Sequence, residues 1–167
     1  MFPNRPRIAI PMTPVRLFVE AAALSFLLAL LAFLYSQWPG IPERVPVKFG
    51  FSGEVVRWGS KQSLLTIPAV AVFLYVAMTV VGRMPHIFNY PAGLNAKNAP
   101  RLYAAGVSLI AWTKAEMVVL FGAMSLGQVA IALGMVRSLG PWFFPLFLAA
   151  PAATALLHIL RMRAAAK

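Results

Sequence analysis

The stretch IPERVPVKFGFSGEVVRWGSK, residues 41–61, is a polar segment between two strongly apolar runs. From Val45 to Phe51, valine or phenylalanine occupies every odd position, and proline, lysine and glycine occupy the even ones. A period of two is typical of a half-buried extended segment and not of a helix. Ser52-Gly53 supplies a turn, and Ser60 can serve as a helix N-cap. The sequence therefore predicts a short extended, hairpin-like loop at residues 41–59 between two helices.

The composition of the chain indicates a membrane protein. Of the 167 residues, 60% are hydrophobic and only four are acidic, and the mean hydropathy is +0.77. A soluble domain of this size needs more charge on its surface. The formal net charge of +11 would favour nucleic acid as the partner of a soluble protein. Here the basic residues lie at the ends of apolar runs, as the positive-inside rule and anionic lipid headgroups require. We therefore expect a lipid bilayer with anionic headgroups as a partner, and no nucleic acid.

Four apolar runs are each long enough to cross a hydrocarbon core of about 30 Å. The sequence predicts an all-α integral membrane protein with four transmembrane helices, at about 14–37, 60–81, 115–135 and 142–161. The third helix is expected to begin already at about residue 99 and to extend into the cytoplasm. Pro68 falls inside the second helix, where a lost backbone hydrogen bond predicts a kink. A basic arm at 1–13, expected on the membrane surface, precedes a single membrane domain at 14–167.

The distribution of basic residues predicts the orientation. With both termini inside, nine basic residues lie on the inner side: Arg5, Arg7, Arg16, Arg83, Lys97, Arg101, Arg161, Arg163 and Lys167. Five lie on the outer side: Arg44, Lys48, Arg57, Lys61 and Arg137. The positive-inside rule then places the N-terminus and the C-terminus in the cytoplasm and residues 41–61 outside it. We expect a multi-pass membrane protein with this orientation.

The residues that usually carry catalysis are scarce. The chain has no Asp and no Cys, two histidines and four glutamates, and it lacks nucleophile-elbow and zinc-binding spacings. We therefore predict no catalytic residue, no metal site, no cofactor and no enzymatic activity. His158, about one turn before Arg161, is a weak axial-ligand candidate for a haem or chlorophyll-type metal. The alternative is a helix-end histidine that bonds a backbone carbonyl or a lipid headgroup.

Three ionisable residues fall within or at the edge of the apolar runs, namely Glu20, Lys114 and Glu116. Charges at this depth are a functional-site hypothesis because their burial is expensive. Lys114 and Glu116 are two residues apart and cannot pair on one helix face. A structural pair between Lys114 and Glu20 is the alternative, because both are expected near the cytoplasmic boundary.

Two stretches resemble a known family. The first is Pro42-Glu43-Arg44-Val45-Pro46-Val47-Lys48-Phe49, followed by Gly53-Glu54 and Arg57-Trp58-Gly59-Ser60-Lys61. The second runs from Phe88-Asn89-Tyr90-Pro91 through Asn98 to Glu116. Together they resemble a bacterial membrane domain of unknown function that also forms the N-terminal part of SdpI-type toxin-immunity proteins. The resemblance covers roughly residues 15–135.

This resemblance implies a multi-helix protein of the bacterial cytoplasmic (inner) membrane with the first motif in a non-cytoplasmic loop. For SdpI-type members it also implies toxin immunity and signalling by sequestering a partner. The chain departs from the family pattern at three places. Lys48 replaces the usual His, Gly50 replaces Asn, and Val55-Val56 replaces Pro-Asp. A function that depends on those polar residues would be lost or changed here.

Two functions follow as expectations. The first is an immunity-type binding protein whose outer loop recognises a peptide, lipid or envelope component. Its candidate binding residues are Pro46, Lys48, Phe49, Gly53, Trp58, Gly59 and Lys61. The second is an accessory subunit packed against another membrane protein or a larger complex. The small residues on one face of the third helix favour it. They are Ala123, Gly127, Ala130 and Gly134.

Overall fold

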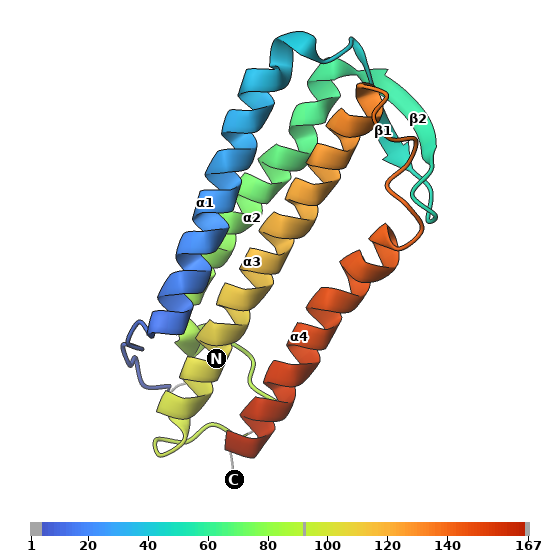
Figure 1. Ribbon diagram of the computed structural model, residues 1–167. Coiled ribbons are helices and arrows are strands. Elements are labelled where there is room, and N and C mark those ends of the chain that lie inside the picture. Colours follow the sequence, from blue (N-terminus) through green and yellow to red (C-terminus); the bar gives the residue numbers. More distant parts are fainter. Residues whose placement is uncertain (1–4, 92, 166–167) are drawn as a thin grey trace.

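The computed structural model describes residues 5–91 and 93–165. Four long helices run side by side, with a β-hairpin at one end and both ends of the chain at the other (Figure 1). The helices are α1 (Pro14–Gln37), α2 (Thr66–Gly82), α3 (Ala99–Ala132) and α4 (Phe143–Ala165). The strands are β1 (Arg44–Phe49) and β2 (Val55–Ser60). Short 3-10 helices cover Trp38–Gly40, Lys61–Leu65 and Pro85–Ile87.

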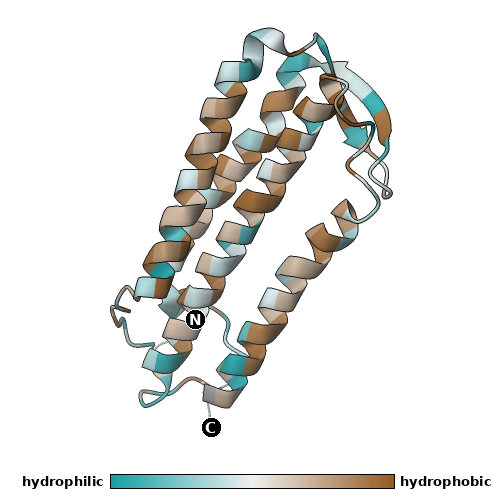
Figure 2. Cartoon of the chain, in the orientation of Figure 1, coloured by the Kyte–Doolittle hydropathy of each residue, from teal (hydrophilic) through white to brown (hydrophobic). Residues whose placement is uncertain are grey.

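All four helical segments are long and apolar enough to cross a bilayer, which confirms the predicted fold class. Figure 2 shows hydrophobic residues along the helices and hydrophilic ones concentrated at the two ends and in the hairpin. Helix α3 is central because α1, α2 and α4 each pack against it. Helix α4 packs chiefly on α3 and leaves most of its surface exposed. Exposed apolar side chains are expected where helices face lipid tails.

Helix α1 begins and ends where the sequence predicts. Thr13 has extended backbone angles, and its side chain accepts a hydrogen bond from the Arg16 backbone N–H at 3.2 Å. Pro14 follows as the first helical residue, where its missing N–H costs nothing. This local chemistry starts the helix without any tertiary contact.

Helix α2 begins later than predicted. Ser60 is the last residue of β2, and residues 61–65 form a 3-10 helix before the α-helix starts at Thr66. The Ser60 side chain caps no backbone N–H and instead lies 3.2 Å from the Ser63 hydroxyl. Pro68 is therefore in the first turn of α2, where the N–H groups have no intrahelical acceptor. The premise of the predicted kink therefore changes, because Pro68 at this position removes no hydrogen bond within α2.

Helix α3 begins at Ala99, as predicted, and is continuous to Ala132. It stops before the expected end at 135 because Gly134 has a φ of 74°, in the left-handed region. The part alongside α1 and α2 begins before residue 115, since Val107 and Ile110 line a cavity together with α1 and α2 residues. The segment of α3 that extends past the ends of α1 and α2 is thus only about two turns long.

Those first turns of α3 lie in a hydrophobic core of their own. Its buried members are Tyr90, Ala99, Leu102, Tyr103 and Met162. Ile8 and Ile10 of the N-terminal arm pack against this cluster. Residues 1–4 of the arm lie outside the described residues. From residue 5 onward the arm packs on the protein itself, and Arg5 donates hydrogen bonds to the carbonyls of His86 and Phe88.

Strands β1 and β2 pair antiparallel, and this confirms the hairpin expected at 41–59. The register shifts between Pro46 and Phe49, so the side-chain alternation is broken by a bulge. Val45 and Pro46 are both buried, although the alternation places their side chains on opposite faces. Phe51 lies in the exposed turn, and its ring stacks on that of Phe144 with centroids 6.5 Å apart.

Candidate ligand pocket beneath the hairpin

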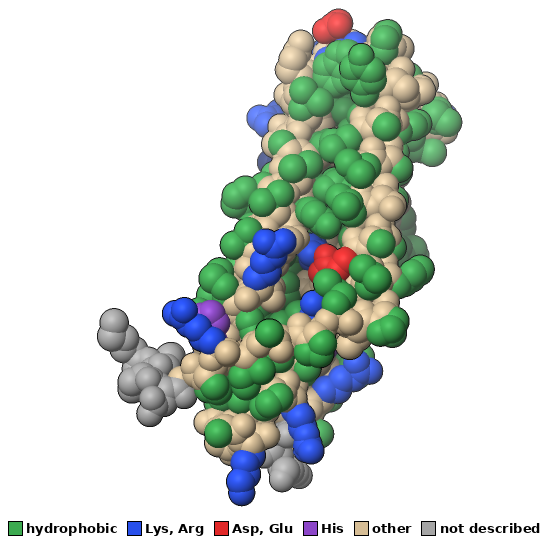
Figure 3. Space-filling view, turned by 90° about the vertical axis from the view of Figure 1, so that its left-hand side faces the viewer, with side chains coloured by type: hydrophobic (Ala, Val, Ile, Leu, Met, Phe, Trp, Pro, Cys, Tyr) green, Lys and Arg blue, Asp and Glu red, His purple; other side chains and the backbone are tan. Residues whose placement is uncertain are grey.

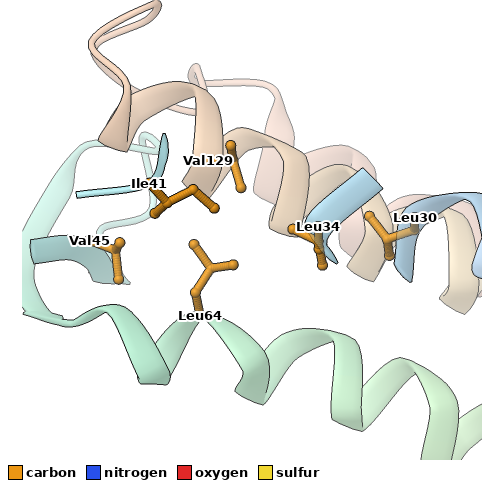
Figure 4. Packing of buried hydrophobic residues seen from close by; sticks show 6 residues of the cluster. All are labelled: Leu30, Leu34, Ile41, Val45, Leu64 and Val129. Atoms are coloured by element: carbon orange, nitrogen blue, oxygen red, sulfur yellow. The ribbon is translucent and has the colours of Figure 1, made fainter. Parts of the chain in front are cut away.

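The hairpin is held on the helix ends by a hydrophobic cluster. Its buried members come from α1, β1, α3 and the segments that flank the hairpin: Leu30, Leu34, Ile41, Val45, Leu64 and Val129 (Figure 4). Val45 of β1 and Leu64 of the 3-10 helix are completely buried. Because α1, α3 and the segment that leads into α2 all contribute to the cluster, the hairpin is positioned rigidly over their ends.

Lys61 fastens the base of the hairpin. Its backbone N–H donates to the Glu43 carbonyl at 2.9 Å, and its ammonium lies 5.1 Å from the centre of the Trp38 ring. The side chain is only 7% exposed. A cation over an indole face is a stabilising contact. Lys61 thus joins β1, the end of α1 and the start of α2, and it does not face the pocket described below.

Gly53 joins the hairpin turn to the α3–α4 connection. Its φ is 80°, and its carbonyl accepts a hydrogen bond from the Leu139 N–H at 2.9 Å. A Cβ atom at this position would lie 2.5 Å from the Gly140 carbonyl oxygen. Only glycine fits this backbone conformation and close approach without strain. Gly53 is thus needed for the backbone conformation of the turn, and it does not line the pocket described below.

A pocket of about 470 Å³ lies between β2, the start of α2 and α3. It is lined by Val47, Arg57, Trp58, Gly59, Ser63, Thr66, Ile67 and Gln128. Its lining combines a guanidinium, an indole, two hydroxyls and aliphatic side chains. Pockets with apolar walls and a few placed polar groups are the usual form of ligand sites.

Gln128 is the buried polar residue of the pocket. It is only 2% exposed, and its Nε2 donates to the Pro46 carbonyl at 2.8 Å. That bond orients the amide and leaves Oε1 as a buried acceptor, which receives no hydrogen bond from the described residues. An unsatisfied buried acceptor costs roughly 1–3 kcal/mol unless another group or a water donates to it.

The structure separates the predicted binding residues. Trp58 and Gly59 line the pocket, and Pro46 contributes its carbonyl to Gln128. Lys48 is exposed and Phe49 half-buried, and neither lines the pocket. Six further residues line it that were not among the predicted binding residues, namely Val47, Arg57, Ser63, Thr66, Ile67 and Gln128. A glutamine inside an otherwise apolar run was the available signal.

The ionisable residues of the helices lie nearer the opposite end. Lys114 is 1% exposed and forms a salt bridge with Glu20, which confirms the structural pair considered from the sequence. The Lys114 ammonium also donates to Thr79 at 2.9 Å and lies 4.7 Å from the centre of the Tyr75 ring. A buried cation needs such partners, and here Glu20 comes from α1 and Thr79 and Tyr75 come from α2.

Glu116 and His158 belong to the contact between α3 and α4. Thr154 donates a hydrogen bond to Glu116, whose second oxygen is buried without a partner among the described residues. In His158, Nδ1 lies 2.9 Å from the Thr154 carbonyl and Nε2 lies 3.4 Å from the Ser108 hydroxyl. Both ring nitrogens therefore face protein groups, as in the backbone-bonding alternative. Within residues 5–91 and 93–165, no three His, Cys, Asp or Glu residues group as metal ligands.

Tyr90, which lies outside the helices, has a pKa that its surroundings shift. Burial, and then the neighbouring Tyr103, raises the pKa of Tyr90 above its ordinary value of 10.0, and Arg5 partly opposes this. The Tyr90 hydroxyl donates to the Pro85 carbonyl at 2.9 Å. It stays protonated and keeps this bond throughout the physiological range.

Comparison with known proteins supports a membrane domain and no specific activity. Residues 24–72 match the model of a domain of unknown function, DUF1648. The match contains the hairpin and ends in α2, and it does not include the second quoted stretch. An uncharacterized protein of Archaeoglobus fulgidus is 41% identical over 86 residues, which cover 47% of this chain and 44% of that protein. No solved structure matches significantly.

Proposed function

We propose that this chain is a multi-pass membrane protein that binds a ligand beneath the β1–β2 hairpin and has no catalytic activity of its own. The observation that carries the proposal is a pocket of about 470 Å³ whose lining includes Gln128, a residue with a buried side-chain oxygen that has no partner among the described residues. A ligand with an N–H or O–H donor would satisfy this acceptor and remove the cost of its burial.

The other walls restrict the chemistry of the ligand. Arg57 favours a carboxylate or phosphate, Trp58 offers an aromatic surface, and Val47 and Ile67 offer an aliphatic one. A peptide segment combines backbone N–H donors, carboxylates and apolar side chains. We therefore propose a peptide as the ligand. This agrees with the immunity-type role that the resemblance to SdpI-type proteins implies.

The proposed location follows from charge. We place the protein in the bacterial cytoplasmic membrane with both termini inside, so the pocket opens on the outer side. The chain has no cysteine, so a single introduced cysteine reports its own side of the membrane. A cysteine at Glu54 should react with an impermeant maleimide added outside intact cells. Reaction only after the membrane is opened from the cytoplasmic side would contradict this orientation.

Pocket filling tests the binding function. Ser63→Trp places an indole in the pocket without removing the bond between Gln128 and Pro46. Ser52→Trp makes the same change in the exposed hairpin turn and serves as the matched control. We expect native mass spectrometry of protein extracted in mild detergent to show a copurifying peptide-sized mass with wild type and Ser52→Trp. Its equal retention by a folded Ser63→Trp variant would refute the pocket as the binding site.

An accessory subunit is the second candidate, favoured by the exposed apolar surface of α4. The small-residue face on α3 supports it less, because Leu139 of the same chain already packs on Gly127. The same mass measurement separates the two functions. A stoichiometric large assembly that persists in Ser63→Trp would favour the subunit, whereas a monomer or homodimer with a small ligand would favour binding.

A further inference from the structure

Two arginines line cavities at the end of the bundle opposite the hairpin. Arg16 lies in the first turn of α1, and Arg83 directly follows the last residue of α2. Two cavities, of about 280 and 240 Å³, share Arg16, Gly82, Arg83 and Val107 in their linings. The two guanidinium groups thus border one hollow region between the helix ends.

These two guanidinium groups have no carboxylate partner among the described residues. Arg16 Nε donates to the Met12 sulfur at 2.9 Å, and sulfur is a weak acceptor. The nearby Glu20 is in the salt bridge with Lys114. Figure 3 shows the face of the molecule that lies on the left in Figure 1. Lys and Arg side chains are gathered on the half of this face that is farther from the hairpin. The region therefore keeps an uncompensated positive charge.

Most of the remaining wall residues are apolar, although Glu20, which is paired with Lys114, and Thr79 also line the larger cavity. Met12, Met78, Val107 and Ile110 line the larger one, and Ile8 and Ile10 line the smaller one beside the arginines. Arg16 and Arg83 mark the ends of two helices long enough to cross a bilayer, which is the depth of the lipid headgroups. Cations at headgroup depth above apolar walls match a phosphate that carries acyl chains.

We infer that Arg16 and Arg83 form a specific site for the phosphate of an anionic phospholipid, with the first part of an acyl chain against the methionine and isoleucine walls. Arginine suits this role because its planar guanidinium can donate two parallel hydrogen bonds to a phosphate. The site is independent of the pocket beneath the hairpin, which lies at the other end of the molecule.

Lipid titration of the purified full-length chain tests the site. The probes are dioleoylphosphatidylglycerol, dioleoylphosphatidylcholine with the same acyl chains and no net charge, and glycerol 3-phosphate without acyl chains. We expect native mass spectrometry to show one phosphatidylglycerol bound at about tenfold lower concentration than phosphatidylcholine, because charge-assisted bonds favour the anion. Glycerol 3-phosphate should not bind at these concentrations, because it lacks the apolar part.

Charge-removing variants localise the effect. Arg16→Gln and Arg83→Gln should each weaken phosphatidylglycerol binding about tenfold, the loss of one charge-assisted contact. Arg137→Gln removes an exposed arginine from the α3–α4 connection and should leave binding unchanged. Equal binding of the two lipids, or an equal loss in Arg137→Gln, would overturn the site. Tight binding of glycerol 3-phosphate would overturn the lipid as its source. Arg16→Lys keeps the charge but cannot form two parallel hydrogen bonds, so we expect a partial loss of phosphatidylglycerol binding. If the thermal stability of this variant equals that of wild type, a folding defect does not explain the loss.

Discussion

Removal of either partner of the Lys114–Glu20 ion pair should destabilise the protein, and by unequal amounts. Lys114 is 1% exposed, whereas the Glu20 side chain is 25% exposed and lines a cavity of about 280 Å³. Glu20→Leu leaves the ammonium buried with only the Thr79 hydroxyl and the Tyr75 ring as partners. Lys114→Met leaves a carboxylate that is already partly exposed.

The expected magnitudes follow from this difference in exposure. Breaking a buried pair by removing one partner costs about 3–5 kcal/mol, and we expect Glu20→Leu to fall in that range. Lys114→Met should cost less, about 1–3 kcal/mol, because the remaining charge is partly hydrated. The double variant should lie within about 1 kcal/mol of wild type, because an apolar pair can replace a buried ion pair of similar volume.

Reversible unfolding in mixtures of dodecylmaltoside and sodium dodecyl sulfate, followed by tryptophan fluorescence, measures these differences. The double-mutant cycle gives the coupling energy directly, and we expect at least about 2 kcal/mol. Additive costs of the two single changes would refute direct pairing. A larger cost for Lys114→Met than for Glu20→Leu would refute the argument from exposure. The exchanged pair, Glu20→Lys with Lys114→Glu, should recover part of the lost stability.

Three further predictions concern the two ends of the molecule. Leu64→Ala should cost about 2–5 kcal/mol in the same unfolding assay, because the side chain is fully buried, whereas the exposed neighbour Leu65→Ala should cost under about 1 kcal/mol. Gly53→Ala should cost at least about 1 kcal/mol because its φ of 80° strains any L side chain. Gly40→Ala, where a Cβ atom meets nothing within 4 Å, is its control, and equal costs would contradict the argument. Burial raises the pKa of Tyr90 above 10.0, so its contribution to stability is complete below pH 10 and falls above it by about 1.4 kcal/mol per pH unit. Tyr90→Phe should remove this term, so an unchanged slope between pH 10 and 11 in the variant would exclude Tyr90 as its source.

Local patterns were sufficient for much of the secondary structure. Thr13-Pro14 starts α1 where predicted because capping is a short-range effect, and the alternation after Val45 indicates the hairpin. The Lys114–Glu20 pair could also be anticipated, because charges within apolar helices must find partners. The position of Pro68 could not, because it depends on where β2 ends and the 3-10 helix gives way to α2.

The pocket residues were harder to predict because they come from separate elements. Trp58 and Gly59 lie in the motif, but Gln128 is about 70 residues farther along the chain and is hydrogen-bonded to the Pro46 carbonyl of the hairpin. The bulge between Pro46 and Phe49 also turns residues away from the faces that the alternation assigns to them. Neither the bulge nor this contact has a signature within one local window of sequence.

The sequence by itself determined the membrane class, the four apolar helices and the hairpin between the first two, because hydrophobicity, periodicity and capping act over a few residues. Only the tertiary structure decided that α3 is central, that the N-terminal arm packs into a second core, and that hairpin and helices enclose a pocket. These features depend on which side chains meet after the chain has folded back on itself. The stretch at 41–61 thus indicates a hairpin by its pattern, and becomes the cover of a candidate binding site only through its contacts with α2 and α3.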